Sequence, residues 1–252
     1  RVGKRLMIYQ SFAQLYDELF DAQLYEQWQD YTLNRLPSTS KTVLDLAGGA
    51  GRLACLLATA GVDLTVADFS PEMLSLAGKH AAETGVDLQL VQADMRDLAG
   101  FPQFDAVTCY ADSLCYLDDL ADVQETFSQV SAHLAAGGRF LFDMISLYQT
   151  DVVYPGYMYN YEDEDQQRAF IWRSFADDDV KHGVIHELAF FNQLPDGNYH
   201  RVGETHFERS YPLEELQAAL QQAGFQRVKV TADFGRQEVT PETTRWFFEC
   251  QK

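Results

Sequence analysis

The chain of 252 residues carries 38 acidic and 19 basic side chains, which gives a formal net charge of −19. Its Lys and Arg residues are scattered, so general binding to nucleic acid or to an anionic membrane is disfavoured. With 46 % hydrophobic and 23 % charged residues the composition is that of a globular protein, and no apolar run approaches the roughly 18 residues that span a bilayer.

The four cysteines show no CxxC pairing and lie within apolar segments: Cys55, Cys109, Cys115 and Cys250. Such a pattern is typical of reduced, buried thiols. No secretory signal pattern is present at the start of the sequence, so we expect a cytoplasmic protein without membrane association.

Residues 1–37 are expected to form a helical cap. Apolar side chains recur at the i, i+3, i+4, i+7 spacing of an amphipathic helix: Phe12, Leu15, Tyr16 and Leu19. The helical pattern continues up to Pro37, where a Ser-Thr-Ser run interrupts it.

Residues 38–145 alternate strands with helices. The predicted strands are 43–46, 63–67, 88–92, 104–109 and 139–143, and the predicted helices are 52–60, 120–134 and one that starts at Pro71. Ser70 supplies an N-cap hydroxyl for that last helix, and Pro71 occupies its first position. Strands that alternate with helices in this way predict a parallel sheet covered on both faces.

The pattern changes over residues 146–211, where three strand-like runs follow one another without a helix, at 166–175, 180–194 and 199–211. Residues 195–198 (Pro-Asp-Gly-Asn) are typical of a hairpin turn. A helix at 213–223 and strands at 226–230 and 245–250 complete the chain within residues 212–252. We expect a single α/β domain over residues 1–252. Its Rossmann-like, doubly wound, mostly parallel seven-stranded sheet would carry an antiparallel β insertion after strand five.

The turn Gly49-Ala50-Gly51 is the strongest local signal for a ligand site. Small residues let the backbone approach a ligand, and the following helix presents unpaired N–H groups and the positive end of its dipole. Gly49, Gly51 and Ala54 also fit the dinucleotide fingerprint G-x-G-x-x-A. Asp68 suits ribose hydroxyls with either kind of cofactor, so the turn alone leaves the choice open.

Two further acids help to decide between cofactors. Asp45 stands two residues before the turn, where the strand of a dehydrogenase is normally apolar. Asp94, at the end of the third strand, can accept a hydrogen bond from an adenine amino group while the Met95 amide donates to the ring.

Five motifs, ordered and correctly spaced over about residues 41–145, resemble those of the class I S-adenosyl-L-methionine (SAM)-dependent methyltransferases. They are the first motif at 43–51, the second at 68–74, the adenine-binding motif at 93–98, the fourth at 104–107 and the turn before strand five at 133–140. The sequence departs from the family at Ala47, which replaces the usual first glycine, and at Gly48, which replaces a common cysteine.

A closer resemblance, carried by residues 11–17, by Asp30-Tyr31 and by the β insertion, is to the small-molecule N-methyltransferase branch, which includes glycine and aminosugar N-methyltransferases. In that branch an N-terminal tyrosine reaches over the cofactor, and the segment after strand four contacts the methionine end and the acceptor. The resemblance implies SAM as cofactor, S-adenosyl-L-homocysteine as product, and the following cofactor-binding residues: Tyr16, Asp45, Ala47, Gly48, Gly49, Gly51, Asp68, Phe69, Met73, Asp94, Met95, Cys109 and Asp112.

Methyl transfer from a sulfonium requires alignment and exclusion of water rather than a catalytic triad, and the sequence shows no triad. A neutral amine attacks directly, whereas a hydroxyl acceptor needs a general base. The weak candidates for such a base are Asp112, His186 and His206, with His182 and His200 behind them. His182 and His186 lie on a strand about 13 Å apart, so no metal site is expected.

A run of tyrosines between strand five and the insertion allows two interpretations: Tyr148, Tyr154, Tyr157, Tyr159 and Tyr161. They could form an aromatic lid over the acceptor pocket, or they could pin an irregular loop by packing.

The sequence therefore predicts a SAM-dependent methyltransferase with a small-molecule acceptor, and N-methylation is slightly favoured. Three alternatives remain: methylation of a tRNA or ribosomal component, an NAD-type oxidoreductase, and a cofactor-binding module without transferase activity. No generic nucleic-acid binding is expected, and a homodimer is possible.

Overall fold

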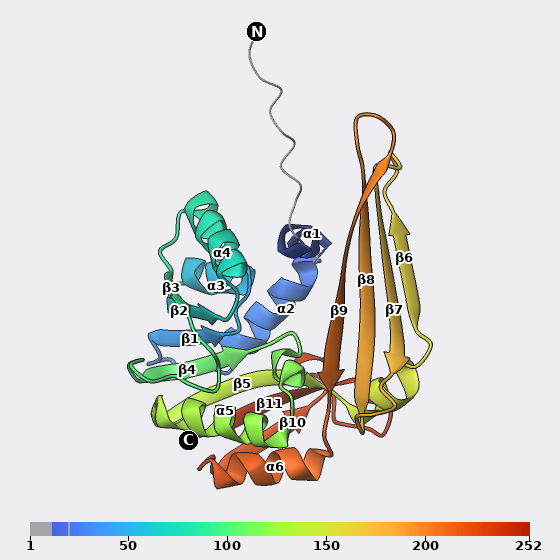
Figure 1. The fold of residues 1–252 in the computed structure, drawn as a ribbon. Coiled ribbons are helices and arrows are strands. Elements are labelled where there is room, and N and C mark those ends of the chain that lie inside the picture. Colours follow the sequence, from blue (N-terminus) through green and yellow to red (C-terminus); the bar gives the residue numbers. More distant parts are fainter. Residues whose placement is uncertain (1–11, 20) are drawn as a thin grey trace.

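The computed structural model describes residues 12–19 and 21–252, and two sheets carry its fold (Figure 1). The larger sheet has the strand order β10-β11-β5-β4-β1-β2-β3. Its strands are β1 (Thr42–Leu46), β2 (Asp63–Asp68), β3 (Gln89–Gln92), β4 (Phe104–Cys109), β5 (Leu134–Ile145), β10 (Arg227–Thr231) and β11 (Arg245–Gln251). Strand β11 pairs antiparallel with both of its neighbours, β10 and β5, and the other pairs are parallel, so the predicted doubly wound, mostly parallel seven-stranded sheet is confirmed.

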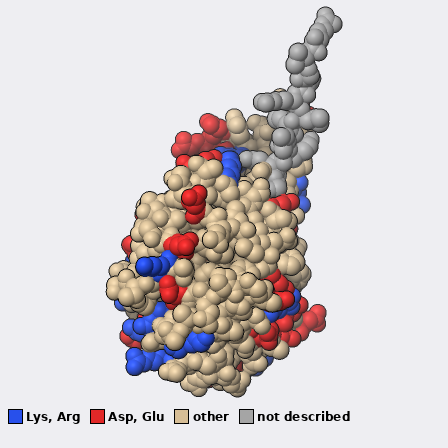
Figure 2. Space-filling model, turned by 90° about the vertical axis from the view of Figure 1, so that its left-hand side faces the viewer, with Lys and Arg blue, Asp and Glu red and all other residues tan. Residues whose placement is uncertain are grey.

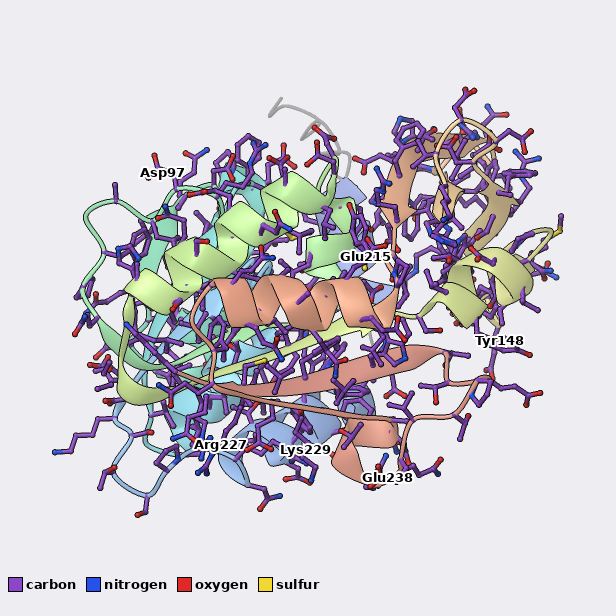
Figure 3. The ribbon with its side chains drawn as sticks, turned by 90° about the horizontal axis from the view of Figure 1, so that it is seen from below. Asp97, Tyr148, Glu215, Arg227, Lys229 and Glu238 are labelled. Carbon is purple, nitrogen blue, oxygen red and sulfur yellow. The ribbon has the colours of Figure 1, made fainter. Side chains whose placement is uncertain are left out.

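Helices cover both faces of this sheet. On one face lie α2 (Ala22–Leu33), α3 (Arg52–Thr59) and α4 (Pro71–Thr84), and on the other lie α5 (Leu120–Ala132) and α6 (Leu213–Gln222) (Figure 1). Seen from below, α5 and α6 lie side by side across the sheet (Figure 3). The central strands are mostly apolar because both of their faces are covered, and Val43, Leu44 and Leu46 of β1 have no exposed surface.

Local chemistry sets the helix ends near the glycine turn. Gly51 is the N-cap of α3 with φ of 70°, a left-handed conformation that suits glycine. At the start of α4 the Ser70 hydroxyl accepts a hydrogen bond from the Met73 amide, and Pro71 occupies the first turn, as the sequence predicts. Gly85 ends the same helix in a left-handed conformation.

The second sheet is antiparallel and stands beside the first as a long wing (Figure 1). It has four strands rather than the predicted three, namely β6 (Met158–Glu162), β7 (Arg168–Ala176), β8 (Gly183–Gln193) and β9 (Tyr199–Arg209). The additional strand β6 comes from the tyrosine-rich segment, because aromatic residues suit an edge strand as well as a loop. Strand β9 is an edge of this sheet and contacts the segment of the core that follows β4, the short 3-10 helix η1 (Ser113–Tyr116).

One contact between the second sheet and the core lies just after η1. Arg209 of β9 donates a hydrogen bond from Nη1 to the carbonyl oxygen of Asp118 at 3.0 Å. Pairing along β8 and β9 is continuous from Gly183–Arg209 to Gln193–Tyr199, so the strand that reaches the core belongs to a rigid ladder.

The predicted N-terminal helical run is divided into α1 (Phe12–Leu19) and α2, with Asp21 as the N-cap of the second helix. Ion pairs hold α1 against the core, since the Asp17 carboxylate contacts Arg52 at 2.5 Å and His80 at 3.3 Å. Leu15 packs into a cluster with Phe170, Leu188 and Phe190 of the second sheet. Thus α1 contacts both parts of the molecule.

All four cysteines are free and buried, as predicted. Among the described helices, none is both long and apolar enough to cross a membrane. The face of the molecule shown in Figure 2 mixes acidic and basic side chains with wide uncharged areas, and Lys and Arg gather toward its lower edge.

Candidate functional site

A cavity of about 640 Å³ lies at the carboxyl ends of the parallel strands. Its lining includes the segments that follow β1, β2, β3 and β4: residues 47–50, 68–70, 93–96 and 110–111. Strands β4 and β2 lie on opposite sides of β1, so the chain switches direction across the sheet at this point. Open α/β sheets bind their ligands at such switch points.

Nine of the residues expected to bind the cofactor line this cavity: Asp45, Ala47, Gly48, Gly49, Asp68, Phe69, Met73, Asp94 and Met95. They come from the ends of three separate strands, β1, β2 and β3, and the parallel sheet brings those ends together. The geometry therefore gathers most of the predicted set in one place.

The Asp68 carboxylate is fixed by two backbone amides. Its Oδ2 accepts a hydrogen bond from the Gly49 N–H and its Oδ1 accepts one from the Ser70 N–H, both at 2.8 Å. Each carboxylate oxygen has a second lone pair, so the group can still accept hydrogen bonds from two hydroxyls. Beside it, the Phe69 ring is 73 % exposed and offers an apolar face to a ligand.

The glycine turn leaves space for a ligand. A Cβ atom added at Gly49 would meet nothing within 4 Å, whereas one added at Gly48 would lie 2.7 Å from Asp45 Oδ2. Ala47, which stands where the resembling family has glycine, adopts φ of 54°. A left-handed alanine costs about 1 kcal/mol, so the backbone at this turn is held by its surroundings.

Asp45 is buried directly behind the turn. Its Oδ1 accepts a hydrogen bond from the Thr108 hydroxyl at 2.7 Å. Burial raises the pKa of Asp45 to about 7, although the Thr108 hydrogen bond partly opposes that rise. Asp45 therefore changes charge near neutral pH inside the cavity lining.

Asp94 lies at the rim of the cavity with Arg96. The Arg96 guanidinium contacts Asp94 at 2.6 Å and Asp122 at 2.9 Å, and it holds the pKa of Asp94 below its ordinary value. Asp94 is consequently an ionised hydrogen-bond acceptor at neutral pH.

An aromatic wall closes one side of the cavity. Trp28 stacks on Tyr110 with ring centroids 6.1 Å apart, and Tyr25 meets Trp28 edge-on at 5.7 Å. All three rings line the cavity. Aromatic faces of this kind attract cations as well as apolar groups.

Sequence reasoning missed the buried Asp143 and its partner Arg245, which hold this wall. Asp143 accepts hydrogen bonds from Trp28 Nε1 at 2.8 Å and from Arg245 Nη1 at 2.9 Å. The only signal in the sequence was an aspartate at the end of an otherwise apolar strand, and nothing there indicated which residues it would meet.

Some predicted residues lie outside the cavity lining. A Cβ atom at Gly51 would lie 2.7 Å from that of Ala77, so this glycine serves the close packing of α3 on α4. Cys109 has no exposed surface. Asp112 forms an ion pair with Arg245, and its N–H donates to Asp143. The side chain of Tyr16 lies outside the described residues.

The three predicted base candidates differ in placement. Asp112 is committed to Arg245, and His186 is buried in the second sheet, where its Nδ1 lies 2.7 Å from the Ser174 hydroxyl. His206 alone among them lines the cavity. It does so together with Glu204 of the same strand and Tyr116 of η1.

The tyrosine-rich segment does not line the cavity. Tyr154 packs against His186 and Trp172, and the edge strand β6 leaves Tyr159 and Tyr161 exposed. In this structure the segment packs and pairs rather than forming a lid, because its backbone joins the second sheet. No group of three or more metal-binding side chains occurs among the residues the structure describes.

Comparisons with known proteins agree on one family. Residues 43–138 match the family described as "Methyltransferase domain". The chain is 40 % identical over 247 residues to the putative methyltransferase YqeM of Bacillus subtilis, covering 98 % of each chain. It is 25 % identical over 233 residues to a glycine/sarcosine N-methyltransferase of Halorhodospira halochloris, covering 88 % of this chain and 80 % of the relative. A crystal structure of a SAM-dependent methyltransferase from Clostridium acetobutylicum superposes with a TM-score of 0.84 at 28 % identity, covering 95 % of this chain and 97 % of the other.

Proposed function

The chain belongs to the SAM-dependent methyltransferases, and we propose that it methylates the nitrogen of a small, cationic amine. The observation that carries this proposal is the charge of the cavity lining. Among the residues that the structure describes, five carboxylates line it against the guanidinium of Arg96, and Asp45 adds a carboxyl group that changes charge near pH 7. The five are Asp17, Asp68, Glu72, Asp94 and Glu204. A cavity of this charge favours cationic ligands over phosphates and carboxylates.

The residues present fit SAM. In the proposed arrangement Asp68 accepts hydrogen bonds from the ribose hydroxyls, Phe69 packs on the adenine, and Asp94 and Met95 contact the adenine edge. Gly49 and Asp45 lie at the methionine end, where the open space beside the glycine admits the ligand. Bound SAM supplies a methyl group already activated by its positive sulfur.

The chain itself then has to position the acceptor and keep water out. The rings of Tyr25, Trp28 and Tyr110 provide an apolar wall that also attracts a cation. The relative named as a glycine/sarcosine N-methyltransferase supports nitrogen as the accepting atom. Because the cavity lining is negatively charged, it further favours an amine that carries no acidic group.

The oxidoreductase alternative is not retained, because the chain belongs to a methyltransferase family. Methylation of an RNA is disfavoured by the same negative lining and by the net charge of −19.

Two measurements test the proposal. Isothermal calorimetry should show binding of S-adenosylhomocysteine and none of NAD. Release of S-adenosylhomocysteine should then be followed with glucosamine and ethanolamine as amines, sarcosine as an amine with a carboxylate, catechol as a hydroxyl acceptor, and unmodified tRNA. The amines are expected to react best. Turnover confined to catechol or tRNA would refute N-methylation of a small amine.

A further inference from the structure

A chain of three polar side chains crosses from the second sheet to the core at the cavity. The Tyr116 hydroxyl lies 3.0 Å from His206 Nδ1, and His206 Nε2 lies 2.9 Å from Glu204 Oε2. Glu204 and His206 are two residues apart on β9, so they share one face of the strand. All three residues line the cavity.

The hydrogen bonds fix the tautomer of a neutral His206 ring. An ionised Glu204 only accepts hydrogen bonds, so the ring proton resides on Nε2. Nδ1 then carries a lone pair and accepts from the Tyr116 hydroxyl. A phenol oxygen both donates and accepts hydrogen bonds, so Tyr116 has the chemistry to accept one from a ligand while it donates to His206.

We propose that Tyr116, His206 and Glu204 form the path by which the acceptor amine loses its proton before methyl transfer. The inference rests on the proposed function. An amine that arrives as an ammonium ion has no lone pair and cannot act as a nucleophile. In the proposed step the N–H bond breaks and its electron pair stays on nitrogen. The proton goes to Tyr116 Oη while the hydroxyl proton of Tyr116 goes to His206 Nδ1.

The charges balance along this path. The positive charge moves from the ammonium to the His206 imidazolium, which the adjacent Glu204 carboxylate stabilises. The lone pair left on the amine is the nucleophile for the methyl group, and His206 afterwards releases its proton to solvent. The Glu204 side chain is 47 % exposed, so solvent reaches this end of the path. Tyr116 contacts the acceptor, and the other two residues act through Tyr116.

Two other titratable groups, His186 and Glu208, lie near His206. His186 is its partner on β8, and Glu208 follows on β9. His186 and Glu208 lie 3.6 Å apart and are buried in the sheet rather than lining the cavity. Arg209 separately anchors β9 to the carbonyl of Asp118, so removal of the His206 ring leaves the strand attached to the core.

The connection can be tested without turnover, by NMR of protein labelled at its histidine rings and saturated with S-adenosylhomocysteine. His206→Gln assigns the His206 signal by its disappearance. The trimethylammonium ion has one N–H that can donate to Tyr116, and the tetramethylammonium ion has none. Only trimethylammonium chloride should therefore change the chemical shift of the His206 ring. Tyr116→Phe should abolish the shift, because the hydroxyl that links the ammonium to the ring is lost.

An equal shift with both ions, a shift that persists in Tyr116→Phe, or no shift with either ion would overturn the path. Failure of S-adenosylhomocysteine to bind would instead refute the proposed function, and the two failures are therefore distinct.

The pH profile supplies a second readout with the best amine from the acceptor panel. His206→Gln and Tyr116→Phe should lower kcat about 100- to 1,000-fold at pH 7. The loss should shrink as the pH approaches the pKa of the amine, which then arrives neutral. His200→Gln, on the same strand but outside the cavity lining, is the matched control and should behave like the wild type. A loss of the same size at every pH would show that the three residues only hold the two sheets together.

Discussion

Asp45→Asn is expected to change how stability depends on pH. Burial raises the pKa of Asp45 from 3.8 in the reference state to about 7 in the folded chain, a difference of roughly 3 units. At about 1.4 kcal/mol per unit, the folded state loses on the order of 4 kcal/mol of unfolding free energy when Asp45 ionises. The folded chain binds this proton more tightly than the unfolded chain. The stabilisation that comes from the protonated Asp45 is therefore fully present below pH 4, and it is lost as the pH rises to about 7.

Asparagine is neutral at every pH and keeps an oxygen for the Thr108 hydroxyl, so the variant lacks this loss. The assay is urea unfolding followed by circular dichroism between pH 4 and pH 8, without ligand. The unfolding free energy of Asp45→Asn minus that of the wild type should rise by about 4 kcal/mol over this range. Asp63→Asn is the control, because Asp63 is exposed at the first position of the neighbouring strand β2. This variant should show no such rise. A difference that stays constant with pH would refute the conclusion that burial perturbs Asp45.

Three further substitutions test the cavity and its support. Asp68→Ala should weaken S-adenosylhomocysteine binding about 10- to 100-fold by calorimetry, since it removes hydrogen bonds to a charged group, while Asp63→Ala on the same strand should bind normally. Phe69→Ala should leave the free energy of unfolding within about 0.5 kcal/mol because the ring is 73 % exposed, and should weaken binding several-fold; unchanged affinity would remove Phe69 from the site. Gly51→Ala should lower the unfolding free energy by about 1–3 kcal/mol in urea titrations, because φ is 70° and the new Cβ would overlap Ala77, and a neutral result would contradict the packing role.

The cofactor side of the cavity was predictable because its residues lie close to strand ends. Asp45, Gly49, Asp68 and Asp94 each fall at or just after a strand that the sequence marks by its apolar run. In a parallel sheet those ends meet at one edge, so the order of the elements is sufficient to bring the residues together. The same reasoning fails for Cys109, because alternation along β4 turns its side chain into the core.

The acceptor side was harder to predict because its residues come from distant segments. Tyr116 and His206 are 90 residues apart, and their contact depends on how the second sheet docks on the core. Nothing in the local pattern of β9 distinguishes His206 from His200, which lies on the same strand. Likewise, Asp112 gave no sign that Arg245 would neutralise it from the last strand. Such contacts are fixed by tertiary packing and not by spacing along the chain.

Under the proposed function, the position of β9 gives the second sheet a role in the chemistry. Strand β9 pairs with only one neighbour, β8, so its other edge is open to the core and contacts η1. An interior strand would have both edges paired and could not make this contact. As the edge nearest the core, β9 brings Glu204 and His206 to a cavity whose other walls belong to the central fold. The cavity thereby joins the proposed cofactor region, set by the parallel sheet, to the proposed acceptor region, set by the insertion. On this proposal, changes in β9 alter the choice of acceptor without touching Asp68 or the glycine turn, because the two regions are built from separate elements.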